Sequence, residues 1–539
     1  MDRIYYNGKI ITMQYSSAEE EKEYTPEAVL VRNGLIVAVG TYAEILQTAE
    51  AGAENYNLDG KCLMPAFIDP HSHFVMNGQM AMWADLSDCE SFDDIIETLK
   101  NYQAKSGNVK AIIGFGYDHN FLKEGRHPDK RVLDKISISL PVFILHVSVH
   151  FACGNSVVLK MAGLDESTPD PEGGKFGRLE DGKNLSGYFE ETAMHAVFRI
   201  LTQNSSGITP EVVDRMQETY LRYGVTTAQD GATNPSEMAT LDRLAQSGKL
   251  QMDIVAYPMM TDHGEETLKN YGQYVNKYQN HVKIGGYKLI LDGSPQGRSA
   301  WMSKPYLGGE PDYCAYPWMT DEQVESYIEE ALKEHKQVLA HCNGDAASEQ
   351  FIMAYQTAVN RVGMKDDLRP VMIHCQTVRN DQLDRMKKLN MMASIFVGHV
   401  WYWGDIHMMN FGPERGNHIS PVRDALDRGL HVNFHQDTPV TRPDMMHSVW
   451  CAVNRISRRG CIIGEDQKIS VYDALRAVTI EGAYEYFEED SKGTIEVGKR
   501  ADLVILEKSP LDVPMAEIKD IKVVETFKDG NSVYCIKEA

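Results

Sequence analysis

The sequence contains no CxxC pair, and its nine cysteines are scattered over 539 residues. They are too few for a disulfide scaffold, and several lie inside apolar runs, as reduced core residues do. The first residues, MDRIYYNGKI, show no secretory signal, and no apolar run approaches the ~20 residues that a membrane helix needs. We therefore expect a cytoplasmic protein that does not enter a membrane.

Basic residues are scarce, because 54 Lys and Arg stand against 77 Asp and Glu, a net charge of −23. This excess of negative charge argues against DNA, RNA or an anionic membrane surface as the partner. With 43% hydrophobic and 24% charged residues, the composition is that of a globular protein. At ~150 residues per domain, the length corresponds to three or four units, or to one large barrel with appendages.

Both chain ends are rich in short strand-forming segments. At the amino end, RIYYNGKIITM and AVLVRNGLIVAVG each carry an Asn-Gly pair between β-formers, which is a hairpin signal. The tail repeats this pattern in GTIEVGKRADLVILE and IKVVETFKDGNSVYCI. Because chain termini often lie close together, we predict a composite β-sandwich from residues 1–63 and 490–539.

Between these ends, short apolar runs alternate with amphipathic stretches, as is typical of βα units. The pattern predicts an α/β fold, a (β/α)8 TIM barrel over residues 64–489. Since roughly 150 residues separate the first strand from the second, we place an inserted domain at 80–205. The eight predicted strands cover residues 64–69, 224–230, 252–259, 282–291, 337–342, 370–375, 391–397 and 431–437.

Residue types that bind metals recur at the ends of these strands. Each of them alone has an ordinary explanation, such as a histidine satisfied in the core. Because barrel closure would bring the strand ends onto one rim, together they indicate a catalytic site. They are His71, His73, Lys288, His341, His374 and Asp437.

The residue types in this set suit a two-metal site. Neutral imidazoles and a carboxylate are ligands for Zn²⁺ or a similar divalent ion. A buried Lys288 with a lowered pKa can be a neutral amine, and such an amine takes up CO₂ to give a carbamate that bridges two metals. Metals lower the pKa of a bridging water to about 7, so hydroxide becomes the nucleophile. Asp437 would act as general base and then as general acid.

The motifs PAFIDPHSHF, YKLILDGS, HCNGDAA, IHCQTV and QDTPV, in this order, resemble the amidohydrolase superfamily. The opening YYNGKIITM and the closing KGTIEVGKRADLVIL are similar to its end signatures. The inserted segment, with GFGYDHNFL and PVFILHVSVHFACGNSVVL, is similar to the amidohydrolase-3 branch, which contains N-substituted formamide deformylase. The resemblance covers essentially the whole chain.

This resemblance implies two Zn²⁺ ions bridged by a carbamylated Lys288, with a single ion as the alternative. Each ion takes two histidines, and Asp437 joins the first: the ligands are His71 and His73 for one ion and His341 and His374 for the other. Two departures flank these ligands. Residues 343–346 read Asn-Gly-Asp-Ala where Ile-Gly-Asp-Arg is commoner, and Gln436 stands where Ser is usual. A substrate other than the formamides is therefore expected.

Candidate substrate contacts come from the insert, from the last predicted strand and from a segment after a barrel strand. Their aromatic and polar character suits a pocket wall, although the same side chains could simply pack the insert against the barrel. They are Tyr117, Asp118, His119, His150, His435 and Trp403.

We predict a metal-dependent hydrolase of a non-peptide C–N bond of amide type in a small molecule. A ring deaminase is the first alternative, but such members of the superfamily usually work with one metal and no bridging lysine, so Lys288 counts against it. The second alternative is a regulatory or scaffold protein without catalysis, against which the six filled ligand positions count. The sequence leaves open whether the chain forms a homodimer.

Overall fold

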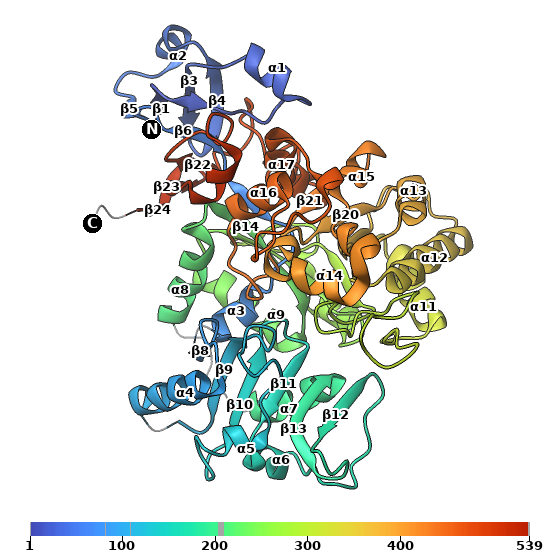
Figure 1. Cartoon of the computed structure of the whole chain (residues 1–539). Coiled ribbons are helices and arrows are strands. Elements are labelled where there is room, and N and C mark those ends of the chain that lie inside the picture. The colour runs from blue at the N-terminus through green and yellow to red at the C-terminus, as the bar shows by residue number, and fades with distance from the viewer. Residues whose placement is uncertain (1, 81, 108, 203–209, 537–539) are drawn as a thin grey trace.

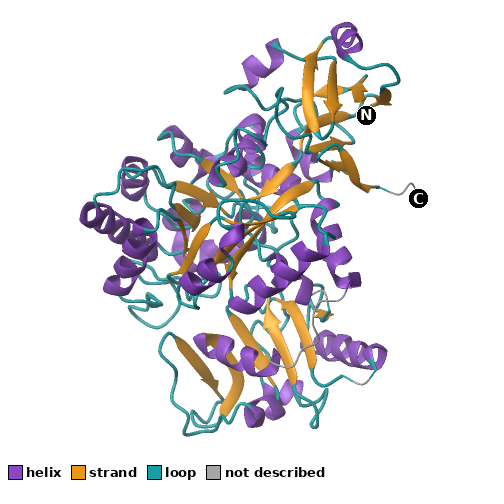
Figure 2. Ribbon diagram, turned by 180° about the vertical axis from the view of Figure 1, so that it is seen from behind, coloured by secondary structure: helices purple, strands orange, loops and turns teal. Residues whose placement is uncertain are grey.

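The computed structural model describes residues 2–80, 82–107, 109–202 and 210–536. Figure 1 shows strands from both chain ends at the top, parallel strands with helices in the centre, and a separate sheet at the bottom. Figure 2 shows the same arrangement from behind. In the described ranges, no helix combines the length and the apolar character needed to cross a membrane.

The central part contains two parallel sheets, of order β16-β15-β14-β7 and β17-β18-β19-β20-β21. Their strands are β7 (Phe67–Asp69), β14 (Val225–Thr233), β15 (Asp253–Pro258), β16 (Val282–Ile284), β17 (Gly286–Ile290), β18 (Gln337–Cys342), β19 (Val371–His374), β20 (Met392–Ile395) and β21 (Val432–Phe434). A strand is found in each of the eight predicted segments, and the α/β class is confirmed. The ladders form two sheets rather than one continuous barrel sheet.

Two of the predicted strands are divided. A single strand over 64–69 is wrong, because β6 (Cys62–Pro65) pairs antiparallel with β22 (Leu503–Leu506) and only β7 joins a parallel sheet. The fourth predicted strand is interrupted at Gly285, where a Cβ would lie 2.5 Å from the Tyr257 hydroxyl oxygen. In both cases the strand is interrupted by its contacts with other segments, and an apolar run in the sequence does not reveal these contacts.

The two parallel sheets are linked on both sides. On one side the chain passes directly from β16 into β17. On the other, the backbone N–H of Asp437 donates to the carbonyl of His71 (3.1 Å), and that of His73 donates to the carbonyl of Thr438 (2.7 Å). The segments that follow β7 and β21 are therefore held side by side.

Helices follow most of these strands and cover them. In α11 (Asp321–Lys333), Val324, Ile328 and Leu332 recur every four residues and are fully buried, so one stripe of the helix faces the sheet. Thr320 begins this helix with a capping box. The other helices of this part are α3 (Phe74–Met80), α8 (Pro210–Leu221), α9 (Pro235–Ser247), α10 (Gly264–Asn270), α12 (Asp345–Val362), α13 (Asn380–Lys388), α14 (His399–Asn417), α15 (Val422–Asp427), α16 (Met445–Asn454), α17 (Val471–Ala477) and α18 (Ile480–Glu485).

The two chain ends form two sheets, of order β4-β3-β1-β5 and β2-β6-β22-β23-β24. Both contribute to one hydrophobic core, which includes Tyr5, Leu63 and Ile505. Their remaining elements are β1 (Asp2–Tyr6), β2 (Lys9–Ile10), α1 (Ala18–Glu23), β3 (Ala28–Arg32), β4 (Leu35–Gly40), α2 (Tyr42–Thr48), β5 (Glu54–Asn57), β23 (Val523–Lys528) and β24 (Asn531–Cys535).

The two Asn-Gly signals have different outcomes. At Asn33-Gly34 the hairpin is confirmed, because β3 pairs antiparallel with β4. At Asn7-Gly8 it is wrong, because β1 and β2 belong to different sheets. A Cβ on Gly8 would lie 2.4 Å from the carbonyl oxygen of Lys61, so this glycine allows a close backbone approach as the chain crosses between the sheets.

The segment between β7 and β14 forms a mixed sheet of its own, of order β12-β13-β11-β10-β9-β8. Its elements are β8 (Ala84–Asp85), α4 (Phe92–Ser106), β9 (Ile112–Tyr117), α5 (Lys130–Leu133), β10 (Val142–His146), β11 (Phe151–Gly154), α6 (Ser156–Met161), β12 (Gly174–Arg178), β13 (Leu185–Glu191) and α7 (Thr192–Thr202). Neighbouring residues of β10 point to opposite faces of this sheet: Phe143 belongs to one hydrophobic cluster and Ile144 to another. Both faces of the sheet are therefore packed against other side chains. The predicted border at residue 205 lies outside the described residues.

A buried ion-pair network joins the chain-end sheets to the parallel strands. Asp253, the first residue of β15, is 1% exposed and lies 2.6 Å from the ammonium groups of both Lys492 and Lys528. Burial by itself raises the pKa of Asp253, but the two ammonium groups hold that pKa well below its ordinary value. Lys492 and Lys528 each have a second carboxylate partner at 2.7 Å, Glu488 and Asp502, so Asp253 is the carboxylate that the two ammonium groups share.

Replacing Asp253 by asparagine removes this charge and nearly preserves the shape. We expect Asp253→Asn to lower the free energy of unfolding by about 3 kcal/mol, because two ammonium groups stay buried without their shared partner. Urea unfolding followed by circular dichroism measures the loss as a lower midpoint. The control Asp59→Asn, at an exposed pair 3.9 Å from Lys61, should change stability by less than about 0.5 kcal/mol. Equal midpoints for the two variants would contradict the role of Asp253.

Candidate metal centre

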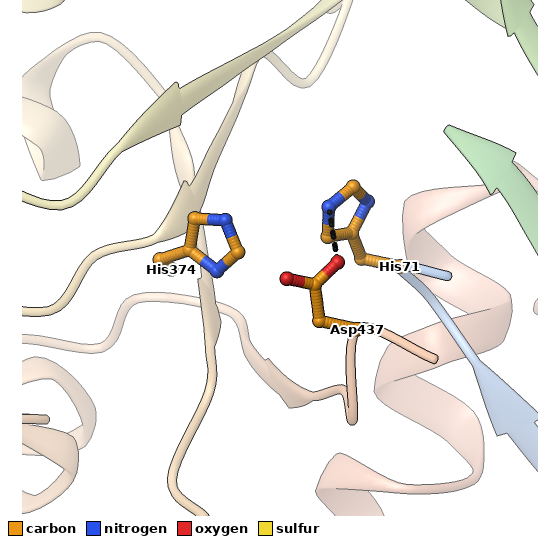
Figure 3. A group of neighbouring side chains, drawn as sticks. All are labelled: His71, His374 and Asp437. Atoms are coloured by element: carbon orange, nitrogen blue, oxygen red, sulfur yellow. Dashed lines mark ion pairs between the residues drawn. The ribbon is translucent and has the colours of Figure 1, made fainter. Parts of the chain in front are cut away.

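Two histidines and a carboxylate converge where the parallel strands end. Candidate ligand atoms of His71, His374 and Asp437 all lie within 4.8 Å of one another, and Figure 3 shows the carboxylate between the two rings. Oδ1 of Asp437 is 3.3 Å from Nε2 of His71 and 3.2 Å from Nε2 of His73. Three of the predicted histidine ligands are thus grouped around the carboxylate of Asp437, which is the fourth.

The remaining two predicted ligands adjoin this group. Nδ1 of His341, in β18, lies 3.0 Å from Nε2 of His374, at the end of β19. Nζ of Lys288, in β17, lies 3.5 Å from Nε2 of His71. The structure therefore brings all six predicted side chains together, from strands that are far apart in the sequence.

The backbone at two of these residues is strained. Asp437 and His374 have φ angles of 54° and 70°, in the left-handed region that residues with a Cβ seldom adopt. Such conformations persist when the surrounding structure enforces them, and they concentrate at functional sites. Here they occur at the last residue of β19 and in the segment after β21, where both side chains reach the cluster.

Hydrogen bonds behind the histidines set the orientation of the rings. Nδ1 of His71 lies 2.7 Å from Oε1 of Gln229, in β14, so it carries the proton and leaves Nε2 free on the cluster side. Nε2 of His341 lies 3.2 Å from the carbonyl oxygen of Gly293, which leaves Nδ1 facing His374. Free ring nitrogens are the atoms that bind metals.

The charge state of the site also suits a cation. Burial, and then the neighbouring basic groups, lower the pKa of His71, His341 and His374 well below its ordinary value, so all three rings are neutral. Burial lowers the pKa of Lys288 to about 8, although Asp437 opposes this shift. In the described part of the chain, Oδ1 of Asp437 is buried and accepts no hydrogen bond. A divalent ion fits a donor set of this kind.

Two of the predicted substrate contacts lie against the cluster. The ring of His435 is 5.1 Å from that of His71, and its Nε2 lies 3.1 Å from Nδ1 of His374. The ring of His150, from the inserted sheet, is 5.4 Å from that of His341.

The other four predicted substrate contacts make their contacts within the insert or between the insert and α14. Nε1 of Trp403 donates to Oδ2 of Asp118 (2.9 Å), which ties α14 to the inserted sheet. Tyr117 is buried inside the insert, with its hydroxyl 3.0 Å from Nδ1 of His127. His119 stacks on the same His127 ring at 4.0 Å. None of these four makes a hydrogen bond or ring contact with the six predicted ligands in the described residues.

Three residues at the site were not among the predicted ones. Gln229 orients His71, and Asp292 accepts backbone N–H groups of the loop that follows His341, including that of Asn343 at 3.0 Å. Both stand at the end of predicted strands, so the rule that selected the ligands would have found them. Glu191, the partner of His150, ends a strand of the insert and carried no comparable signal.

Known proteins are similar to this chain in sequence and in fold. A family model described as the amidohydrolase family matches residues 54–534. N-substituted formamide deformylase of Arthrobacter pascens is 25% identical over 524 residues, which cover 94% of each chain. Protein LONG AFTER FAR-RED 3 of Arabidopsis thaliana is 27% identical over 547 residues, which cover 99% of this chain and 91% of that protein.

A solved structure covers the same extent. It is that of an uncharacterized metal-dependent hydrolase from Pyrococcus horikoshii OT3, with a TM-score of 0.76 and 25% identity. The match covers 96% of this chain and 99% of that one, so it includes the chain-end sheets, the parallel strands and the insert.

The contact between Gln229 and His71 can be tested through metal affinity. Gln229→Ala removes the acceptor that fixes the His71 ring, and we expect the affinity for Zn²⁺ to fall by about 10–100-fold. Competition with a chromophoric chelator measures this change. Gln350→Ala is the matched control, because Gln350 is also buried but bonds to the backbone oxygen of Met319. An unchanged affinity in Gln229→Ala would mean that His71 is not a ligand oriented in this way.

Proposed function

Because the chain belongs to the amidohydrolase family, we propose that it is a metal-dependent hydrolase that cleaves a non-peptide C–N bond of amide type in a small molecule. The observation that carries this proposal is the group of neutral histidines around the buried Oδ1 of Asp437. The named deformylase supports amide-type chemistry, since it acts on N-substituted formamides. We further propose a cytoplasmic location, with no nucleic-acid or membrane partner.

We assign the ligands as the motifs suggest. His71, His73 and Asp437 would hold one Zn²⁺ ion, and His341 and His374 would hold the second. Two bound ions would polarise the scissile carbonyl and lower the pKa of water at the site. The short distances among the ring nitrogens and Oδ1 of Asp437 support this assignment.

Lys288 is assigned as a carbamate that joins the two halves of the site. Its Nζ is buried, and the lowered pKa of about 8 leaves part of the population as neutral amine at neutral pH. A neutral amine adds to CO₂, forming an N–C bond and releasing one proton, and the product carries one negative charge. This anion would replace the positive charge that a lysine otherwise brings among cation ligands.

Asp437 is assigned as the group that moves the proton. Since its Oδ1 accepts no hydrogen bond within the described residues, it is available to take a proton from the attacking water. Attack on the amide carbonyl gives a tetrahedral intermediate, and Asp437 returns the proton to the departing nitrogen. The left-handed backbone of Asp437 keeps the carboxylate beside His71 and His73 while this happens.

Two alternatives remain as outcomes of the tests below. A ring deaminase would use the same cluster of side chains with one metal ion. A regulatory protein without catalysis is suggested by the plant relative, whose name describes no enzyme.

Elemental analysis of protein purified without chelators tests the proposal first. We expect about two divalent ions per chain and hydrolysis of at least one member of a panel of N-acyl and N-formyl amides. About one ion per chain would favour the deaminase. No bound ion and no turnover, even after addition of Zn²⁺ and bicarbonate, would leave the regulatory alternative.

Lys288→Ala separates the hydrolase from the deaminase. We expect amide turnover to fall by about 10²–10³-fold, because the bridging anion is lost. Added acetate should restore part of the activity, since a free carboxylate can occupy the place of the carbamate. Lys333→Ala, at an exposed lysine on α11, is the control and should keep full activity. A Lys288→Ala variant with nearly normal turnover would argue against the carbamate.

A further inference from the structure

The insert contains a second group of two histidines and a carboxylate, apart from the metal centre. Asp118 and His119 directly follow β9, and His146 is the last residue of β10, which pairs with β9 in parallel. Because the two strands run in the same direction, their carboxyl ends bring these three side chains together. Candidate ligand atoms of all three lie within 4.8 Å of one another. We call Asp118, His119 and His146 the insert triad.

The distances within the insert triad are those between ligands of one metal ion. Nδ1 of His119 lies 3.2 Å from Nε2 of His146. Oδ1 of Asp118 lies 3.3 Å from Nε2 of His146 and 3.7 Å from Nδ1 of His119. Ligand atoms at ~2.0–2.1 Å from a tetrahedral Zn²⁺ ion are about 3.3 Å apart. At the metal centre, the corresponding distances from Oδ1 of Asp437 to two histidine nitrogens are 3.3 and 3.2 Å.

Ordinary hydrogen bonds do not account for these distances. A hydrogen bond from an imidazole N–H to a carboxylate is normally about 2.7–2.9 Å long. In the described chain, four other pairs of this kind are 2.7–2.8 Å long: His150–Glu191, His281–Asp253, His335–Asp366 and His431–Glu481. The metal centre and the insert triad both depart from this value, and in both of them two rings face one carboxylate oxygen.

Groups behind the insert triad hold its ligand atoms in place. The backbone N–H and Nδ2 of Asn120 both donate to Oδ1 of Asp118 at 2.9 Å. Nε1 of Trp403 donates to Oδ2 of the same carboxylate. Nδ1 of His146 lies 2.8 Å from Oγ of Ser148, which can accept a proton from it and so leave Nε2 without one. Such hydrogen bonds are typical behind metal-binding carboxylates and histidines.

The charges of the insert triad also suit a cation. Burial lowers the pKa of His119 to about 4, so this ring is neutral at pH 7. Burial alone would raise the pKa of Asp118, but the neighbouring ring of His146 holds that pKa below its ordinary value, so the carboxylate is ionised. The side chain of His119 is 18% exposed, so solvent and ions can reach the triad.

The other tautomer of His146 gives the alternative without an ion. The backbone nitrogen of Ser148 lies 3.1 Å from Nδ1 of His146, and if Nδ1 accepts this N–H, Nε2 keeps its proton. That one proton would then be shared between Asp118 and His119 over long distances. The two tautomers differ in whether Nε2 can bind a metal, so metal binding distinguishes them.

We propose that Asp118, His119 and His146 bind a divalent first-row ion such as Zn²⁺, with water in the remaining position. The ion would lie at the junction of the insert with α14, because Asp118 also accepts the hydrogen bond from Trp403. The site shares no residue with the metal centre and does not depend on the proposed function. With three protein ligands and no carbamate, it is the weaker site and fills when Zn²⁺ is added.

Zinc titration of the full chain, in competition with a chromophoric chelator, tests the site. We expect the parent protein to take up one further Zn²⁺ ion per chain beyond those of the metal centre. Asp118→Asn and His119→Gln should bind this ion at least about 100-fold more weakly, because each loses a ligand rather than a group behind one. Circular dichroism verifies that both variants fold.

Two control variants bracket this result. His195→Gln changes a histidine of α7 in the same insert but outside the triad, and it should keep the further ion. His71→Gln changes the metal centre and should also keep it. Elemental analysis of His119→Gln then counts the ions of the metal centre alone.

Equal Zn²⁺ uptake by the parent, Asp118→Asn and His119→Gln would overturn the site and leave the triad as a hydrogen-bonded cluster. A parent protein that takes up no further ion would overturn it as well. Failure of the proposed function is seen separately, as a protein that hydrolyses no amide and holds no ion at the metal centre, whether or not the insert triad binds Zn²⁺.

Discussion

The carboxylate of Asp437, whose Oδ1 is buried, is the constraint on which the site depends. Its Oδ1 faces the Nε2 atoms of His71 and His73 at 3.3 and 3.2 Å and accepts no hydrogen bond in the described residues. A buried carboxylate oxygen without a hydrogen bond is costly. A cation placed among these atoms removes the cost. The strained backbone of Asp437 and His374 is then explained, because it brings ligands from two strand ends to one point.

The ion pairs that stabilise the fold and the candidate metal ligands lie at different ends of the parallel strands. Asp253 begins β15 and ties the parallel strands to Lys492 and Lys528, near the chain-end sheets. Most of the ligand candidates lie at or after the other ends of the strands, where His150 of the insert contacts His341. The hydrogen bond between Trp403 and Asp118 fastens the insert to α14.

The sequence was most informative where a signal is local. Apolar runs marked the parallel strands, and the residue types just after them marked the ligand candidates, because parallel strands bring their carboxyl ends to one side. The sequence was least informative where contacts between distant segments determine the course of the chain. The crossing at Gly8 depends on the carbonyl of Lys61, and the break at Gly285 depends on Tyr257. Glu191 could not be chosen from the sequence either, since its role comes from its contact with His150.

The two departures from the branch pattern differ in what they touch. The amide of Gln436 is satisfied within its own loop: its Nε2 donates to Ser448 (2.8 Å), and its Oε1 accepts from Thr441 (2.7 Å). Asn343 instead donates through Nδ2 to the carbonyl of Gly293 (2.8 Å), beside His341, and its Oδ1 is buried without a donor in the described structure. Gln436 therefore maintains a loop. Asn343 is the departure that places an unpaired polar atom in the residue next but one to His341, one of the predicted ligands.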